Sequence, residues 1–509
     1  MRTLSLIFFV VFCLVHWSNV QTLDPIGLKV SAELRGFRLG AAILVNYLRN
    51  QIDQGQYNSH LIQNYQLIVP GAELKPQHIW IGRHNYNFVD SDWLLGATPD
   101  SIGWVQENNM HLRGHTLIWA YDMRLPKWLL AEESIISPND AKNLLSDYIH
   151  AVVGRYKGKI QWWDVINELI SDYPNTRPFH IRDSLWYRKL GIDFVKYAYQ
   201  FAHEADPDAL LYYNDYGIEA GGFKANQSLS VIDWLQSQGV PIHGFGMQWH
   251  KNLTEAVTPG DAHYQNAQQF INRNISFMIT ELDVAIPMKD DQPIDPQEFD
   301  KQGALYRSVL ELALHFYPQC PALLTWGVTD RYSWIPAATN DTEGDALPLD
   351  KNYQPKPAYL QMQEVLARVV DDGFYRLSPV SQSDSCLGVN SNSSSSTVQL
   401  FTGICNDSHA QWNVTWQNDG TYRVSPKVAI NSALSVSNTT TTGYVFVSSW
   451  TEDATQEWVI TPQDNNAYRF GPRTAWERVL AVDETSHIVV TNYTMDPSQQ
   501  WLLTRSFFL

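Results

Sequence analysis

Two glutamates, each at the end of an apolar run, are the residues of this chain best suited to do chemistry. WWDVINE ends at Glu168, and FMITELD carries Glu281, 113 residues further along. Parallel strands that are buried on both faces read as apolar runs, and reactive groups in a (β/α)8 barrel lie where such strands end. Two carboxylates that face each other there are suited to cleaving a glycosidic bond. One acid protonates the leaving oxygen, while the other attacks or activates water.

Eight apolar segments, separated by helix-like stretches, predict the barrel that would position this pair. The expected strands lie at residues 36–42, 65–69, 111–119, 159–167, 209–214, 242–248, 275–281 and 322–327. This alternation is typical of βα units. Polar or aromatic residues follow nearly every segment, which is where active sites of barrels form. The predicted fold class is therefore α/β, a (β/α)8 TIM barrel, followed by an all-β domain.

The N-terminus and the length set the expected organisation. Residues 1–20 contain Arg2 followed by an apolar stretch, which matches a secretory signal peptide. No later segment approaches the ~18 consecutive apolar residues of a membrane span. The rest of the chain exceeds one ordinary domain. We expect a secreted, extracellular protein with a hydrolase domain at 21–370 and a second domain at 374–509.

Composition limits the classes of partner. The formal charge of −17 and the pI near 5.3 disfavour nucleic acid and anionic membranes, since phosphate-binding surfaces need clustered Lys and Arg. A carbohydrate or glycoside substrate fits better, and some of the 19 Trp and 25 Tyr residues can stack on sugar faces while most fill the core. The sequence contains neither a metal-ligand cluster nor a cofactor motif, so we expect no metal and no cofactor. A monomer is expected.

Cysteines and glycosylation sequons agree with export. Cys13 falls in the signal, and Cys386 and Cys405, 19 residues apart in the small domain, are the expected disulfide. Cys320 is then expected to be a buried free thiol. Nine Asn-x-Ser/Thr sequons predict surface asparagines. They are at Asn226, Asn252, Asn274, Asn340, Asn392, Asn406, Asn413, Asn438 and Asn492.

Nine motifs between about residues 36 and 365 resemble glycoside hydrolase family 10 in type and order. They are GHTLIW (114–119), LPKW (125–128), WDVINE (163–168), SLWYR (184–188), YYNDY (212–216), GFGMQWH (244–250), ITELD (279–283), TWGVTDRYSW (325–334) and the QPKPAY that ends at Tyr359. The resemblance implies a retaining double displacement, with Glu168 as general acid/base and Glu281 as nucleophile. Glu168 must then hold a proton while Glu281 stays ionised.

The resemblance also implies a set of residues around this pair. Asn167 would hydrogen-bond the 2-hydroxyl of the sugar, a contact that strengthens in the transition state. His250 and Asp283 would orient the nucleophile, with Gln248 beside it. The implied substrate-binding or supporting residues are Lys75, Trp119, Asn167, Asn214, Gln248, His250, Asp283, Trp326 and Trp334.

The chain departs from the family at three positions on the glycone side. The family usually reads Thr-Pro-Glu-Asn-x-Met-Lys-Trp after its second strand, where this chain has Gly71, Ala72 and a retained Lys75. Ala120 replaces a His that commonly follows GHTLIW. In a site built to bind sugar hydroxyls, each hydrogen-bond partner that is lost weakens substrate binding by about 1–3 kcal/mol. The lost bulk makes room for the hydroxymethyl group of a hexose.

Three functions therefore stay open. The first is an endo-β-1,4-xylanase-like hydrolase. The second keeps the mechanism but acts on a hexose-containing glycoside, as in a tomatinase-like enzyme that removes the oligosaccharide from a saponin. The third is a non-catalytic glycan-binding protein, for which the altered glycone side would be the support. The intact carboxylate pair argues against this last alternative.

A threefold repeat fills the C-terminal region. Tyr-Arg pairs open its units at residues 375, 422 and 468, which lie 47 and 46 residues apart. CLGV, ALSV and VLAV occupy equivalent places, and Trp412, Trp458 and Trp501 close the units. The pattern resembles a ricin-type β-trefoil, in which repeats bury a shared core.

The sugar-binding acids of such a trefoil are missing. An Asp of each Cys-Leu-Asp-Val segment would bind sugar hydroxyls, and its places are taken by Gly388, Ser435 and Ala481. A fold can persist without its site. Sugar binding of the usual ricin type is therefore not expected, and a stabilising or spacing role is the alternative.

Overall fold

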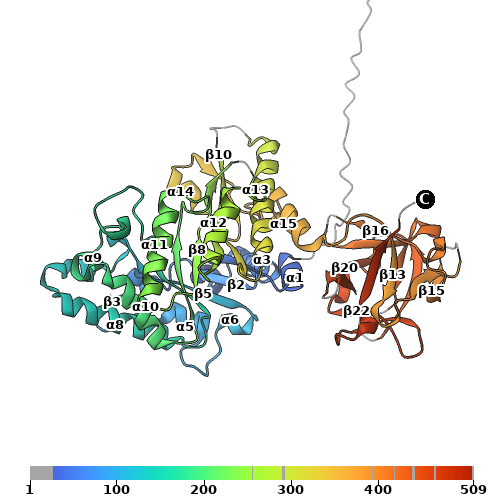
Figure 1. Ribbon diagram of the computed structural model, residues 1–509, viewed down its shortest axis with the longest axis horizontal. Coiled ribbons are helices and arrows are strands. Elements are labelled where there is room, and N and C mark those ends of the chain that lie inside the picture. Colours follow the sequence, from blue (N-terminus) through green and yellow to red (C-terminus); the bar gives the residue numbers. More distant parts are fainter. Residues whose placement is uncertain are drawn as a thin grey trace, which may run out of the picture.

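The computed structural model describes residues 27–506 except 255, 289–292, 392–394, 418, 438–441 and 464–465. The expected signal peptide at 1–20 and the sequons at Asn392 and Asn438 lie outside the described residues. Figure 1 shows a barrel surrounded by helices, which is followed along the chain by an all-β body. Within the described part of the chain, no helix is long and apolar enough to cross a bilayer.

Eight parallel strands close the barrel, in the order β1, β2, β5, β6, β7, β8, β10 and β11, with β11 pairing back to β1. Each overlaps one of the eight predicted strands, so the predicted barrel is confirmed. The strands are β1 Arg38–Ile43, β2 Leu67–Pro70, β5 His111–Trp119, β6 Trp162–Asn167, β7 Leu210–Asp215, β8 Gly244–Met247, β10 Ser276–Pro287 and β11 Ala322–Thr325. Three shorter strands, β3 (Trp80–Gly82), β4 (Asn85–Tyr86) and β12 (Glu343–Gly344), lie outside the barrel path, and β9 (His250–Asn252) pairs with β10.

Helices cover the outside of the barrel. The longest, α8 and α13, begin with Pro at the first turn after a capping Ser137 or Asp295, as helix starts favour. The helices are α1 Leu28–Glu33, α2 Val45–Arg49, α3 Gln56–Asn64, α4 Pro76–Ile79, α5 Val89–Leu95, α6 Trp104–Glu107, α7 Lys127–Ala131, α8 Pro138–Arg155, α9 Leu185–Leu190, α10 Asp193–Ala205, α11 Phe223–Ser237, α12 Ala262–Ile271, α13 Pro296–His315, α14 Ile335–Thr339 and α15 Pro357–Ala367.

Buried apolar side chains on both faces of the strands explain their near-continuous hydrophobic sequence. One small cluster contains Leu67, Trp162, Tyr212, Met278 and Leu324, which come from five different strands of the barrel. A much larger cluster joins other strand residues to the surrounding helices. The barrel is thus closed and packed, which fixes the strand ends on which the candidate site stands.

The C-terminal strands form a second, separate structure with its own hydrophobic cluster. Six of them make a closed antiparallel barrel, and the others form three hairpins, one in each sequence repeat. The strands are β13 Gly373–Pro379, β14 Ser385–Val389, β15 Ser396–Thr402, β16 Trp412–Trp416, β17 Tyr422–Pro426, β18 Ser432–Val436, β19 Gly443–Ser449, β20 Glu457–Pro462, β21 Ala467–Pro472, β22 Arg478–Val482, β23 Ile488–Asn492 and β24 Trp501–Arg505.

The three tryptophans that close the repeats have the same role in each. The indole Nε1 of Trp412 donates to the carbonyl of Leu387 at 2.8 Å, and Trp458 and Trp501 repeat this bond in their own units at 2.9 Å. Cys386 and Cys405 form the predicted disulfide, and Cys320 is the predicted buried free thiol.

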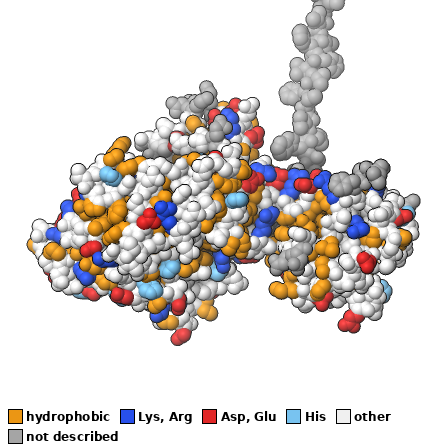
Figure 2. All heavy atoms as spheres, in the orientation of Figure 1, with side chains coloured by type: hydrophobic (Ala, Val, Ile, Leu, Met, Phe, Trp, Pro, Cys, Tyr) orange, Lys and Arg blue, Asp and Glu red, His pale blue; other side chains and the backbone are white. Residues whose placement is uncertain are grey.

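The two structures meet beyond α15. The backbone N–H groups of Val369 and Val370 donate to the hydroxyl of Tyr422 at 2.7 and 2.9 Å. Figure 2 shows acidic and basic side chains gathered where the two parts adjoin. Near the end of α15, Glu364 pairs with Arg307 at 3.0 Å and with Arg368 at 2.7 Å. The hydrogen bonds to Tyr422 therefore fasten the C-terminal structure to the segment that follows α15.

Candidate active site

Glu168 stands one residue beyond strand β6, at the C-terminal end of the barrel. Its φ is 54°, in the left-handed region that non-glycine residues rarely adopt and that recurs at functional sites. Strand register places Trp119 of β5 beside Asn167, and Asn167 beside Asn214 of β7. The turn therefore presents Glu168 next to polar side chains from three adjacent strands.

The Glu168 carboxyl group accepts two hydrogen bonds. The Trp119 indole donates to Oε2 at 2.9 Å, and the Gln248 amide donates to Oε1 at 3.2 Å. Burial raises the pKa of Glu168, and the charges of Asp215 and Glu281 raise it further, against the lowering effect of the two hydrogen bonds. The environment thus favours the protonated form, as a general acid requires.

Glu281, within β10, lies in the opposite electrostatic setting. Asn214 Nδ2 donates to its Oε1 at 2.7 Å, and His250 Nε2 lies 3.1 Å from its Oε2. Burial would raise the pKa of Glu281, but the hydrogen bond from His250 and the nearby imidazole of His115 outweigh it, so the pKa is lowered. Glu281 is therefore held as a carboxylate, as a nucleophile requires.

His250 links Glu281 to Asp283. β9 pairs with β10 so that His250 lies directly opposite Asp283, and its Nδ1 is 3.0 Å from Asp283 Oδ1. Burial alone would lower the pKa of His250, but Asp283 and Glu281 raise it to about 10. The imidazole is then protonated at neutral pH and donates to both carboxylates. The Trp334 indole donates to the other oxygen of Asp283 at 2.8 Å.

Two asparagines connect the two halves of the site. Asn214 Nδ2, besides its bond to Glu281, donates to Asn167 Oδ1 at 2.9 Å, while Asn214 Oδ1 accepts from Thr280 at 2.7 Å. Gly246 of β8 leaves room for this amide, because a Cβ there would lie 2.0 Å from Asn214 Oδ1. Asn167 Nδ2 is buried without a partner among the described residues, so it is a donor available to a ligand.

Lys75, from the loop after β2, carries its ammonium group between two indoles. Its Nζ lies 4.9 Å from the Trp119 ring centroid and 5.7 Å from that of Trp326. Burial lowers the pKa of Lys75 to about 8, partly opposed by the charge of Glu281. A cation is thereby held beside the carboxylate pair.

These side chains surround one cavity of about 560 Å³. Of the eleven predicted site residues, Asn214 and Asp283 do not line it but hold the residues that do. The predicted residues that line it are Lys75, Trp119, Asn167, Glu168, Gln248, His250, Glu281, Trp326 and Trp334.

His115 lines the cavity as well, and sequence reasoning did not include it among the site residues. Its Nδ1 lies 2.9 Å from Asp164, which also forms a buried ion pair with Arg113. Together with His250, it helps to lower the pKa of Glu281. His115 lies in the GHTLIW motif and Asp164 in the WDVINE motif. Their position within these two motifs could have indicated that they belong to the site.

Three tyrosines from distant segments line another side of the cavity, and we call them the tyrosine wall: Tyr47, Tyr57 and Tyr332. The Tyr47 and Tyr332 ring centroids are 4.7 Å apart, and those of Tyr57 and Tyr332 are 5.9 Å apart. Asp53 accepts a hydrogen bond from the Tyr332 hydroxyl at 2.9 Å, which orients that ring. The wall is uncharged and offers ring faces.

The three altered glycone-side positions do not share one environment. Gly71, Ala72 and Ala120 are all described by the structure, and of the three only Gly71 lines the cavity. A Cβ at Gly71 would lie 3.5 Å from the Leu44 side chain. Ala120 is buried in the hydrophobic core instead. The nearby Glu73 turns to the backbone, accepting from the N–H of Val45 at 2.7 Å. An apolar surface thus borders the place of the missing family glutamate.

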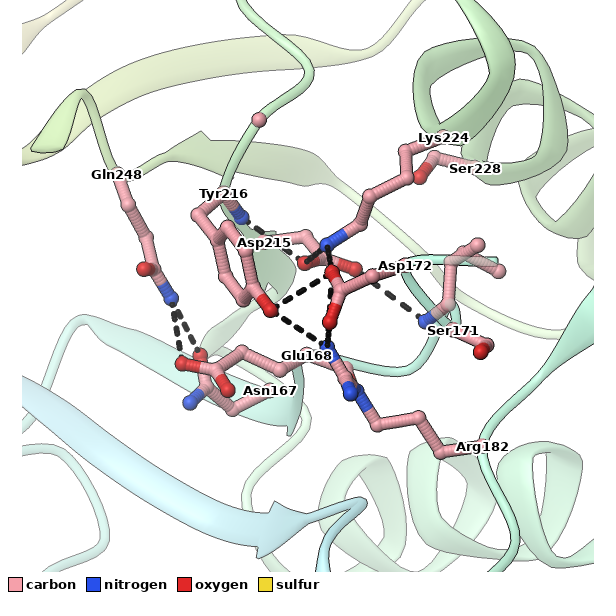
Figure 3. Close-up of polar contacts among 12 residues, drawn as sticks. Asn167, Glu168, Ser171, Asp172, Arg182, Asp215, Tyr216, Lys224, Ser228 and Gln248 are labelled. Atoms are coloured by element: carbon pink, nitrogen blue, oxygen red, sulfur yellow. Dashed lines mark hydrogen bonds and ion pairs between the residues drawn. The ribbon is translucent and has the colours of Figure 1, made fainter. Parts of the chain in front are cut away.

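A charged cluster lies beyond Glu168, on the side of β6 and β7 (Figure 3). Asp172 accepts from the Tyr216 hydroxyl at 2.7 Å and pairs with Arg182 and Lys224 at 3.2 Å each. Arg182 Nε also donates to the carbonyl of Glu168 at 3.0 Å. The cluster therefore holds the loop that follows the strained Glu168 turn.

Comparison with known proteins agrees with this architecture. The model of glycosyl hydrolase family 10 matches residues 27–365. Endo-1,4-beta-xylanase B of Thermotoga neapolitana is 32% identical over 343 residues, covering 67% of this chain and 92% of the relative. The endo-1,4-beta-xylanase of Agaricus bisporus is 34% identical over 296 residues, covering 58% of this chain and 81% of the relative.

A solved structure shares the fold. Native xylanase 10B from Thermotoga maritima superimposes with a TM-score of 0.61 at 32% identity, covering 67% of this chain and 98% of that one. Fold, family model and relatives coincide over the same two thirds of the sequence. The chain therefore belongs to glycosyl hydrolase family 10 and is a glycoside hydrolase that acts on O-glycosyl bonds.

Proposed function

We propose that this protein is a secreted, retaining, endo-β-1,4-xylanase-like glycoside hydrolase, with Glu168 as general acid/base and Glu281 as nucleophile. The single observation that carries this assignment is the opposite shift of the two carboxyl groups across one cavity. Burial and neighbouring acids raise the pKa of Glu168, while His250 and His115 help to lower that of Glu281. Pairs of carboxyl groups with separated pKa values divide the roles of acid and base.

The reaction then takes two steps. Glu281 attacks the anomeric carbon while Glu168 gives its proton to the leaving glycosidic oxygen, which forms a covalent glycosyl-enzyme. Glu168, now a carboxylate, takes a proton from water as the water attacks the same carbon and releases Glu281. The free Asn167 amide N–H is available for the sugar 2-hydroxyl.

The test is the configuration of the first product. We expect ¹H NMR of xylo-oligosaccharide hydrolysis to show the β-anomer first, followed by slow mutarotation. Initial release of the α-anomer would contradict the assignment of Glu281 as a nucleophile. The control is Glu281→Gln, for which no early anomer signal is expected.

A hexose-containing glycoside is the second candidate substrate, and the altered glycone side favours it. Gly71 replaces the family glutamate, and Leu44, Tyr47 and Tyr332 offer uncharged surface nearby. Comparing kcat/KM for aryl β-xylobioside with aryl β-cellobioside and β-lactoside decides between the two. A strong preference for xylobioside would exclude the hexose alternative.

The remaining parts of the proposal concern location and organisation. We assign residues 1–20 to a signal peptide, 21–370 to the hydrolase domain and 374–509 to a ricin-type β-trefoil. The six-stranded barrel with its three hairpins and the repeated Trp-to-carbonyl bonds support the trefoil. Gly388 carries no carboxylate, and a Cβ there would lie 2.6 Å from Phe401, so the usual lectin acid has no room.

A further inference from the structure

The three repeats of the C-terminal domain each carry an arginine after their first Tyr: Arg376 in β13, Arg423 in β17 and Arg469 in β21. Two of them lie against an aromatic ring. The Arg423 guanidinium carbon is 4.7 Å from the Trp450 ring centroid, and that of Arg469 is 4.7 Å from the Tyr493 centroid. In the second and third repeats, a ring thus covers the face of the guanidinium.

The first repeat lacks this ring. Trp450 and Tyr493 stand eight residues before the Trp that closes their repeat, and the equivalent residue of the first repeat is Ile404. Ile404 is 54% exposed, and its side chain carries no ring. Nε lacks a partner in all three arginines, but among the described residues Arg376 is the one with no ring over it.

The uncovered guanidinium borders a surface recess of about 490 Å³. Asp384, Asp407 and Ile404 are among the residues that line it. Cys405, also in the lining, is tied to Cys386 by the disulfide, which fixes the loop on this side. The recess is therefore fixed in place by the disulfide, and it is lined by one basic and two acidic residues.

We propose that this recess binds an uncharged phenolic ring, which stacks on Arg376 where Trp450 and Tyr493 stack in the other repeats. Guanidinium groups are weakly hydrated and planar, so an aromatic face is a favourable cover for them. The phenol hydroxyl donates to Asp384 or Asp407. These two carboxylates disfavour an anionic ligand. Gly388, which takes the place of the ricin-type acid, does not line the recess, although Ile404 and Asp407 also line a neighbouring cavity beside the β14–β15 hairpin.

The equivalent ring of the third repeat shows that a phenol suits such a place. Tyr493 stacks on Arg469 and donates its hydroxyl to the side-chain oxygen of Gln463. An external phenol in the first repeat would make the same pair of contacts, one by its face and one by its hydroxyl.

The test uses the full-length protein and methyl ferulate, a neutral phenolic ester, in saturation-transfer NMR. We expect Ile404→Trp to fill the recess with the ring of the other repeats and to weaken binding at least tenfold. Arg376→Gln is expected to weaken it similarly. Ile430→Trp is the matched control, because Ile430 is also an exposed isoleucine of this domain, at 42%, but does not line the recess. It should bind methyl ferulate as the wild type does.

Folding and catalysis are checked in parallel. All variants should keep the wild-type Tm and the wild-type rate on an aryl glycoside, since the recess is remote from the carboxylate pair. Equal binding of methyl ferulate by wild type, Ile404→Trp and Arg376→Gln would overturn the proposal. So would a loss on Ile404→Trp of xylobiose binding alone, which would make the recess a sugar site. Because Asn406 lines the recess within a sequon, the series is repeated with Asn406→Gln.

Discussion

The two sides of the active-site cavity are built on different principles. On the side of β6, β7 and β10, hydrogen bonds connect Trp119, Glu168, Gln248, Asn167, Asn214, Glu281 and His250 without a break. On the side that follows β1 and β11, the lining is uncharged. It consists of Ala42, Ile43, Leu44, Tyr47, Tyr57, Gly327, Val328 and Tyr332.

This difference separates chemistry from recognition. Charge develops at the anomeric carbon and at the leaving oxygen during the reaction. Hydrogen-bond donors and carboxylates must therefore be held in fixed positions around these two atoms. The uncharged side offers tyrosine rings and apolar groups, which suit contacts with parts of a substrate that do not react, by stacking and by shape. Of the three departures from the family, Gly71 lines the cavity, and Ala120 is buried in the core, while the carboxylate pair and its hydrogen-bond partners are retained.

The largest expected effect comes from removing the nucleophile. Glu281→Gln keeps the volume and the contact with Asn214 but cannot attack the anomeric carbon. We expect kcat to fall by roughly 10⁴-fold or more, on the scale seen when other nucleophiles are removed. Stopped assays on an aryl xylobioside measure it, and circular dichroism checks the fold. A fall of less than tenfold in a folded variant would remove Glu281 from the mechanism.

Glu168→Gln should lower kcat less than Glu281→Gln does, and the size of the loss should depend on the leaving group of the substrate. General acid catalysis is worth about 10²–10⁴-fold. A dinitrophenolate leaves without a proton, so its glycoside should lose little in the first step, while a natural xylo-oligosaccharide should lose the full amount. Measuring both substrates on one variant separates an acid from a residue with a general structural role. An equal loss on both would contradict the acid assignment.

Asn214→Ala tests the link between the two halves. The change removes the donor to Glu281 and to Asn167, both within 2.9 Å. A hydrogen bond to a charged group is worth about 1.5–3 kcal/mol, so we expect kcat to fall roughly 10- to 150-fold. KM should change little, because Asn214 does not line the cavity. A rise in KM at unchanged kcat would place Asn214 in binding instead.

The connected side could be predicted from sequence, because its residues stand at strand ends. WDVINE, QWH and ELD each place a polar residue directly after an apolar run, and closure of the barrel must bring those ends together. The eight strands followed from the same pattern. The predicted role of His250 beside Glu281 agrees with the contact between them, but the sequence could not supply the hydrogen bond from Asn214 to Glu281, which depends on register between strands.

The uncharged side could not be predicted for a physical reason. Tyr47 and Tyr57 come from the helical segment after β1, and Tyr332 comes from the loop after β11, nearly 300 residues later. Tyrosines on helices usually fill the core, so nothing in their spacing marks a wall. Likewise, Gly71 and Ala120 are both small residues in the sequence, while only the folded chain distinguishes a cavity position from a core position.

The pH dependence of kcat/KM should be bell-shaped. Glu281 must be deprotonated, and its lowered pKa sets the acidic limb below that of an ordinary glutamate. Glu168 must be protonated, and its raised pKa sets the basic limb above that of an ordinary glutamate. Activity should fall about tenfold per pH unit beyond each limb.

The Trp119 hydrogen bond lowers the pKa of Glu168, so Trp119→Phe should move the basic limb to higher pH and leave the acidic limb in place. Movement of both limbs together would contradict separate titration of the two groups.

The smallest effect is expected from placing a carboxylate on the uncharged side of the cavity. This change tests the comparison between the two sides most directly. Gly71→Glu restores the family's acidic residue, and Leu44→Ala gives its side chain more room. The new Cβ lies 3.2 Å from the Ile43 carbonyl oxygen, so the backbone there must shift by a few tenths of an ångström. The new carboxylate should accept hydrogen bonds from xylose hydroxyls, and we expect the ratio of kcat/KM for xylobioside over cellobioside to rise roughly three- to tenfold, about 0.7–1.4 kcal/mol. Leu44→Ala alone is the control, since it adds space without an acceptor and should leave the ratio near the wild-type value. If the double variant keeps its Tm and the ratio does not move, the uncharged side is not what selects the sugar.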